Sequence, residues 1–197
     1  MIKKILIPIF SLISIWNINA QIVNIPDANF KAALVANAGI NTNGDTEIQK
    51  DEAEIYSGGI DVRYKNITDL TGIEAFVALT ELNCSVNQLS SIDITKNTAL
   101  TFLDCSINKL IELDVTKNSD ISSLNVSYNK LTSLDVSQNT SLITLQFISN
   151  QISELDISKN LEVEDLRFSA NQIAELNISQ NLNLKWLLCG DNQLTAL

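Results

Sequence analysis

Oxygen-bearing side chains recur at alternate positions between residues 41 and 52, with a spacing that could hold a metal ion. Asn41, Asn43, Asp45 and Glu47 occupy positions 1, 3, 5 and 7 of this twelve-residue segment, and Glu52 occupies position 12. Calcium takes about six to eight oxygen ligands, which carboxylates, amides and backbone carbonyls can supply. Because Asp45 and Glu52 would be the only charged side-chain ligands, we expect any calcium binding to be weak.

This segment resembles the calcium loop of an EF-hand, with two departures. Asn41 stands where such loops carry Asp, and Thr46 stands where a glycine makes the sharp turn. A β-branched residue tolerates the positive φ of that turn badly. The alternative is a loop that keeps the shape without the metal. It would join a helix over residues 26–38, closed by Gly39, to a second helix packed on the solenoid that follows.

A repeat of 21 residues begins near Ala78 and predicts the secondary-structure elements of the rest of the chain. Its leucines alternate with polar residues, which is the period of a strand with one buried face. Ile92 and Ile94 alternate around Asp93 and predict a second extended side in each turn. Stacked turns can bury an apolar face that a single repeat cannot. We therefore predict a β-rich repeat solenoid with short parallel strands, a right-handed superhelix and a small helical N-terminal cap. The leucines are Leu82, Leu103, Leu124, Leu145, Leu166 and Leu187.

Two columns of asparagine follow the same period, and we expect both to be structural. An inward amide offers a donor and an acceptor to backbone groups that leave the sheet at a bend. Each column would therefore form a hydrogen-bonded ladder between successive turns. The first column is Asn87, Asn108, Asn129, Asn150, Asn171 and Asn192, and the second is Asn97, Asn118, Asn139, Asn160 and Asn181.

The groups that carry most enzyme chemistry are absent or misplaced. The chain has no histidine, the commonest general base. Cys84, Cys105 and Cys189 fall in one apolar column, so we expect buried thiols, with a Cys84–Cys105 disulfide as the alternative. Asp104 and Asp165 would lie three strands apart, roughly 14 Å, farther than the ~5–9.5 Å of paired glycosidase carboxylates. We therefore expect no catalysis.

The repeat resembles the leucine-rich repeat, because Leu79, Leu82, Cys84, Asn87 and Leu89 follow the pattern L-x-x-L-x-L-x-x-N-x-L. The run over residues 66–74, N-I-T-D-L-T-G-I-E, resembles the arrays of internalins, which are bacterial surface proteins. From about residue 25 onward the chain resembles secreted bacterial leucine-rich-repeat proteins with a degenerate EF-hand-like cap. The resemblance implies protein binding or adhesion. Because the sequence stops at Leu197, halfway through a turn and without a polar cap, we expect the array to be truncated there, with an intact protein as the alternative.

The resemblance also implies a binding surface on the concave side of the solenoid, lined by the outward positions of the strands. Most of these positions carry small polar residues. Phe102, Arg167 and Trp186 differ, because aromatic residues and Arg are enriched at binding hot spots. Structure beyond Leu197 that covers Trp186 is the alternative. The candidate partner-binding residues are Glu81, Phe102, Asp104, Asn125, Asp165, Arg167 and Trp186.

The first twenty residues predict export. Lys3 and Lys4 precede an apolar run of twelve residues, and small residues lead to a cleavage site before Gln21. The run is shorter than the ~20 residues that span a bilayer, although a retained anchor is an alternative. We expect a secreted or cell-surface protein with no membrane span after cleavage. The predicted segments are a signal peptide at 1–20, a cap at 21–57, a first repeat at 58–77 and the array at 78–197.

The net charge of −10 argues against nucleic acid and anionic lipid as partners, although it also favours solubility. We expect a protein partner on a host or envelope surface and no cofactor other than weakly held calcium. The alternatives are a glycan-binding module and a structural spacer in a larger surface protein.

Overall fold

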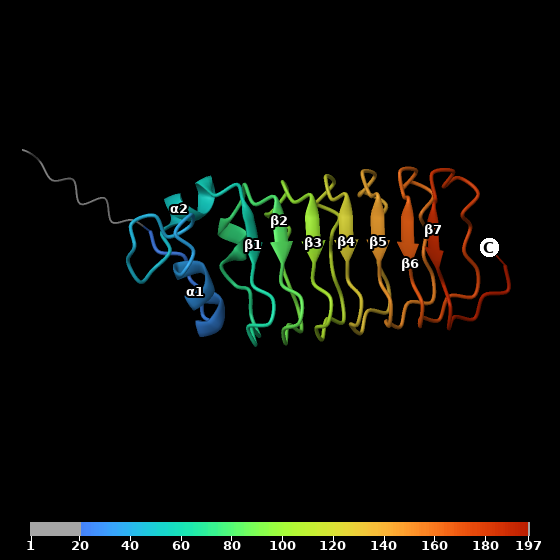
Figure 1. Cartoon of the computed structure of the whole chain (residues 1–197), viewed down its shortest axis with the longest axis horizontal. Coiled ribbons are helices and arrows are strands. Elements are labelled where there is room, and N and C mark those ends of the chain that lie inside the picture. Colours follow the sequence, from blue (N-terminus) through green and yellow to red (C-terminus); the bar gives the residue numbers. More distant parts are fainter. Residues whose placement is uncertain (1–20, 197) are drawn as a thin grey trace, which may run out of the picture.

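The computed structural model describes residues 21–196, which form an elongated solenoid of about six turns behind a small helical cap (Figure 1). Seven three-residue strands pair in chain order into one parallel sheet. The predicted fold class is therefore confirmed. The predicted signal peptide lies outside the described residues. The strands are β1 (Gly59–Asp61), β2 (Glu81–Asn83), β3 (Phe102–Asp104), β4 (Ser123–Asn125), β5 (Thr144–Gln146), β6 (Asp165–Arg167) and β7 (Trp186–Leu188).

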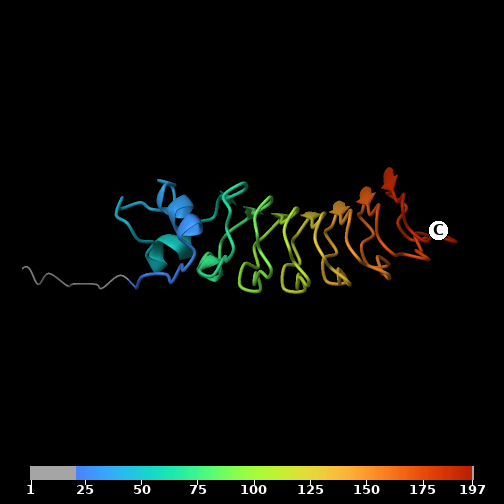
Figure 2. The ribbon, with the colours of Figure 1, turned by 90° about the horizontal axis from the view of Figure 1, so that it is seen from below.

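The 21-residue period places the central leucine of each strand beside its neighbours in the sheet. Leu82 pairs with Leu103, and Leu103 with Leu124, and all three are fully buried. The flanking residues of each strand point outward, on the inner side of a shallow curve (Figure 2). The opposite side of each turn is extended but carries no strand ladder in residues 21–196. Ile94 is buried there and Ile92 is half-buried.

The column that holds the cysteines runs through the core. Cys84 and Cys105 are buried free thiols, and the rings of Phe147 and Phe168 stack in the same column with centroids 5.5 Å apart. Cys189, predicted to be buried, is only half-buried, because no described turn follows it. Burial raises the pKa of the Cys84 and Cys105 thiols, so neither is a reactive thiolate.

The first asparagine column links successive turns with both ends of its amide. Asn129 donates through Nδ2 to the carbonyls of Cys105 and Val126, both at 3.0 Å, and accepts through Oδ1 from the Leu110 N–H. The residue before each of these asparagines has a positive φ, between 53° at Ile107 and 57° at Ala170. The amides thus hold a tight and strained bend in every turn.

The second asparagine column differs from our prediction. Asn139 donates to the carbonyls of Val115 and Asn118, at 2.9 and 2.8 Å. Its buried Oδ1 accepts no hydrogen bond from the described residues, and the same is true at the other four positions. The prediction that these side chains also accept hydrogen bonds is therefore wrong. The backbone N–H groups at this bend bond to carbonyls of their own turn instead, as the N–H of Asn139 does to Val136.

The cap contains α1 (Ala28–Val35) and α2 (Lys50–Ile55), and a 3-10 turn, η1 (Ile73–Ala75), precedes the array. The first helix is shorter than the predicted 26–38. It begins after Asp27, whose carboxylate accepts the N–H groups of Asn29 and Phe30. It ends before Asn37, because the Asn37 side chain accepts the Gly39 N–H and competes with further helix.

Candidate interaction surface

The outward residues of the seven strands form what we call the concave face. Strand register arranges them in two parallel rows, and all seven predicted partner-binding residues lie in these rows. The first row is Gly59, Glu81, Phe102, Ser123, Thr144, Asp165 and Trp186, and the second is Asp61, Asn83, Asp104, Asn125, Gln146, Arg167 and Leu188.

One cluster on this face lies at its C-terminal end. Arg167 donates from Nε and Nη2 to the two carboxylate oxygens of Asp165, each at 2.8 Å, and this pairing raises the pKa of Arg167. Asp165 pairs in register with Trp186, and Arg167 pairs with Leu188. The four side chains line a hollow of about 220 Å³. Sequence reasoning identified Arg167 and Trp186 separately, and the sheet register brings them together.

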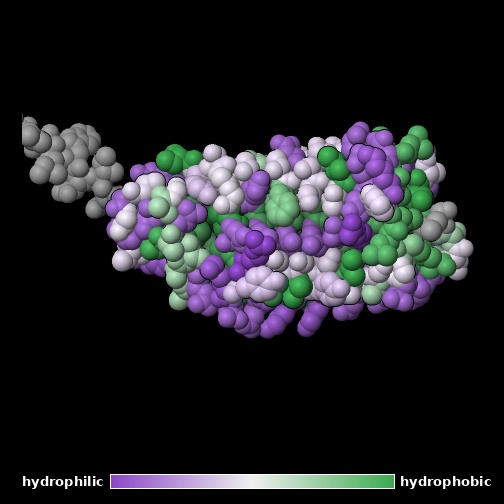
Figure 3. Space-filling view, in the orientation of Figure 1, coloured by the Kyte–Doolittle hydropathy of each residue, from purple (hydrophilic) through white to green (hydrophobic). Residues whose placement is uncertain are grey.

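Hydrophobic residues gather at this same end of the molecule (Figure 3). Trp186 is 68% exposed and Leu188 is 50% exposed. Because both lie beside the Arg167–Asp165 pair, an apolar surface and a fixed ion pair are available to one ligand. This combination is typical of protein-binding surfaces.

A second hollow, of about 310 Å³, lies at the other end of the face. It is lined by Phe102 and Glu81 together with four residues that sequence reasoning did not select, Gly59, Ile60, Asp61 and Asn83. Phe102 points outward as predicted and is half-buried. Asn83 lies 21 residues before Asp104 and could have been found from the column spacing, whereas Gly59 and Asp61 lie 22 residues before Glu81 and Asn83 and fall outside that spacing.

The predicted calcium ligands in the cap lie in one loop, where hydrogen bonds from the chain itself engage them. Glu52 accepts through Oε1 from the N–H groups of Thr42 and Asn43 and from the Thr42 hydroxyl, and through Oε2 from the Gln49 N–H. Burial alone would raise the pKa of Glu52, but these hydrogen bonds outweigh it and lower that pKa. These hydrogen bonds tie the Glu52 carboxylate to both ends of the loop.

The other candidate ligands in this loop also have partners. Asp45 accepts the Glu47 N–H and the Asn43 amide, whereas Glu47 pairs with Lys31 at 2.6 Å. Asn41 donates through its amide to the Asp45 carbonyl. The positive φ of the loop falls at Gly44, two residues before Thr46. Residues 21–196 contain no group of three or more acidic, Cys or His side chains placed to hold a metal. Weak calcium binding in this loop therefore stays a prediction.

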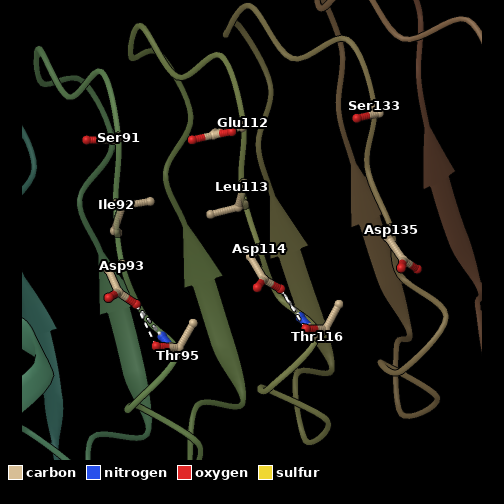
Figure 4. A pocket seen from close by; sticks show the side chains of 10 residues that line it. All are labelled: Ser91, Ile92, Asp93, Thr95, Glu112, Leu113, Asp114, Thr116, Ser133 and Asp135. Carbon is tan, nitrogen blue, oxygen red and sulfur yellow. Dashed lines mark hydrogen bonds between the residues drawn. The ribbon is translucent and has the colours of Figure 1, made fainter.

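A groove of about 510 Å³ crosses the convex side, where Asp93, Asp114 and Asp135 line up (Figure 4). Each aspartate accepts the backbone N–H of the residue two positions later, such as Thr95 at 3.0 Å from Asp93. Hydrogen bonds from the Thr95 and Thr116 hydroxyls, together with these backbone N–H groups, lower the pKa values of the three carboxyl groups. The column therefore stabilises turns.

Comparisons with known proteins identify structural relatives. No protein-family model and no curated protein matches the sequence. The functional domain of InlJ from Listeria monocytogenes, described as including a cysteine ladder, is 35% identical over 90% of this chain, with a TM-score of 0.69. A leucine-rich-repeat protein of Leptospira interrogans is 28% identical over 73% of this chain, with a TM-score of 0.62. Internalin C2 of Listeria monocytogenes, 18% identical with a TM-score of 0.63 over 86% of each chain, shows the fold alone.

The chain spans 46% of the length of the InlJ domain and 38% of the Leptospira protein. Within residues 21–196, no helix is long and apolar enough to cross a membrane. The 21-residue repeat, the parallel sheet and these structural neighbours agree on the architecture. The chain is therefore a leucine-rich-repeat protein with internalin-like structural neighbours.

Proposed function

We propose that this chain is an exported, non-catalytic module that binds another protein through its concave face. The neighbours are internalins and other leucine-rich-repeat proteins, a fold that generally serves protein interaction. The partner would be a protein on a host or envelope surface, which an exported protein can reach. The basic residues and apolar run at the start of the sequence support export.

The observation that carries this proposal is the cluster of Arg167, Asp165, Trp186 and Leu188. The two hydrogen bonds to Asp165 restrict the Arg167 guanidinium, so less side-chain freedom is lost when a partner binds. Trp186 offers a large amphipathic surface beside it. A fixed Arg next to an exposed Trp is the composition expected at the centre of a protein interface.

Affinity capture from envelope and host-surface extracts tests the proposal. The baits are the wild type, an Arg167→Gln, Trp186→Ser double variant and a control, Glu112→Gln, on the convex side. Circular dichroism first verifies that all three are folded. We expect a protein that the wild type and the control retain and the double variant loses. Equal retention by all three baits would refute binding at this cluster.

The same variants separate the alternatives. A glycan module would bind immobilised sugars and lose them on Trp186→Ser, without retaining any protein. A structural spacer would retain nothing that depends on the concave face. N-terminal sequencing of the exported product tests export, and we expect the mature chain to begin at Gln21.

A further inference from the structure

We propose that the concave face around Phe102 receives a basic side chain, Lys or Arg, of the protein partner. This inference rests on the proposed protein-binding function and adds the chemistry of the partner at a second point on the same face. It concerns the end of the sheet opposite the Arg167–Trp186 cluster.

Register places Phe102 between a carboxylate and a small residue. On β2 its partner is Glu81, and on β4 its partner is Ser123. Beyond Glu81 the row ends at Gly59, where a Cβ atom would lie only 3.2 Å from Glu81 Oε2. The missing side chain at Gly59 therefore leaves room for the Glu81 carboxylate. The hollow beside the Phe102 ring remains open.

The adjacent row supplies a second carboxylate. Asp104 lies two residues after Phe102 on β3, between Asn83 and Asn125 in register. Its Oδ1 accepts from the N–H and hydroxyl of Ser106, and its Oδ2 accepts from Asn125 at 3.3 Å. These neutral donors hold the side chain in place without neutralising its charge.

Charge pairing on the face is uneven, and this favours a cationic ligand. Of the four acidic residues in the two rows, Asp61 pairs with Arg63 at 2.9 Å, and Asp165 pairs with Arg167 at 2.8 Å. Glu81 and Asp104 have no Lys or Arg nitrogen within 4.0 Å in the described part of the chain. Negative charge that the protein leaves unpaired therefore flanks the one aromatic ring at this end of the face.

These three groups together match a basic side chain. An Arg or Lys is attracted to the face of an aromatic ring, and carboxylates strengthen that attraction. The overall charge of −10 would steer a basic partner toward the chain. The same charges repel acidic segments and phosphate, so the chemistry selects a basic segment of a protein.

Binding of a fluorescent hexaarginine peptide to the purified chain tests this inference, measured by anisotropy at low and at physiological salt. The site variant is Glu81→Gln, Asp104→Asn. The control variant is Glu112→Gln, Glu154→Gln, which removes the same charge from exposed positions on the convex side. Phe102→Leu removes the aromatic ring and keeps an apolar side chain. Glu81→Gln alone serves if the double variant does not fold, because Glu81 makes no hydrogen bond with its side chain in residues 21–196.

We expect the site variant to weaken peptide binding about tenfold and the control by less than about twofold. Phe102→Leu should weaken it about threefold. Equal weakening in the site and control variants, or no effect of Phe102→Leu, would overturn the inference. No binding of hexaarginine to the wild type would overturn it as well. If a captured protein still depends on Arg167 and Trp186 in that case, the proposed function stands and only this inference fails.

Discussion

The two asparagine columns make different hydrogen bonds, so the same substitution should have different effects in each. In the first column, Asn129→Ala removes two donations, to the Cys105 and Val126 carbonyls. Both carbonyls keep a bond from the amide of a neighbouring asparagine. The Leu110 N–H, in contrast, has Asn129 Oδ1 as its partner at 3.0 Å in a buried position. The substitution leaves this N–H unpaired.

In the second column, Asn139→Ala leaves no buried backbone N–H without an acceptor among the described residues. The Val115 and Asn118 carbonyls that accept its amide also accept backbone N–H groups, at 3.0 and 3.2 Å. Asn139 Oδ1 is buried without a hydrogen-bond partner in the described residues, so its removal relieves a desolvation penalty. The loss of two donations is therefore partly offset.

These contacts give a difference in the free energy of unfolding. For Asn129→Ala, two lost donations at about 1 kcal/mol each and one unpaired N–H at about 1–3 kcal/mol amount to about 3–5 kcal/mol. For Asn139→Ala, two lost donations at about 1 kcal/mol each, offset by about 1–3 kcal/mol from removing the unpaired oxygen, leave a change between about −1 and +1 kcal/mol. Both changes remove the same atoms, so the cavity term largely cancels in the comparison.

Thermal and urea unfolding of both variants and the wild type, followed by circular dichroism, measures this difference. A gap of about 3 kcal/mol corresponds to a Tm about 6–12 °C lower for Asn129→Ala than for Asn139→Ala in a chain of this size. Equal Tm values, or a lower Tm for Asn139→Ala, would refute the assignment of the unpaired groups.

Four further predictions concern the cap, the thiols and the bend. Calcium at millimolar concentration should not raise the Tm, and Glu52→Ala should lower it with or without calcium; a calcium-dependent rise would contradict the hydrogen-bonded loop. Because the folded pKa of Glu52 is lowered, its contribution to stability is present above the ordinary carboxyl pKa and is lost as the pH falls through the folded value; Glu52→Gln should flatten this part of the stability profile. In the folded chain a thiol reagent should modify Cys189 quickly and leave Cys84 and Cys105 unreacted until denaturant is added; fast reaction of all three would disprove their burial. Ile107→Asn should raise stability by about 1 kcal/mol, because Asn tolerates the positive φ that a β-branched residue resists; a lower Tm would show that this bend is unstrained.

The candidate surface was only partly predictable from the sequence. The 21-residue spacing was sufficient to assign outward strand positions, and all seven selected residues lie on the concave face. The spacing did not show that Arg167 donates hydrogen bonds to Asp165. The two residues lie two positions apart on β6, and their contact depends on the conformations of both side chains. Nor did it select Gly59 or Asp61, because their turn departs from the repeat pattern and its strand is recognised only by pairing with β2.

The cap shows the same limit in another form. The spacing of oxygen-bearing side chains in residues 41–52 predicted a loop that could bind calcium. The spacing alone does not show which hydrogen-bond donors contact the carboxylate of Glu52. In the folded chain the backbone N–H groups of Thr42, Asn43 and Gln49 reach Glu52. Similarly, both asparagine columns look alike in the sequence, and only the folded bends distinguish an acceptor that is used from one that is not.

The sequence by itself determined the solenoid, its period, its buried columns and its outward rows, because each turn contacts only its neighbours and the period translates directly into register. The tertiary structure alone decided which charges on the concave face are neutralised, which hollows form and which buried groups remain unpaired. Those outcomes depend on distances of a few tenths of an ångström between side chains from different turns, and a linear pattern of residue types does not encode them.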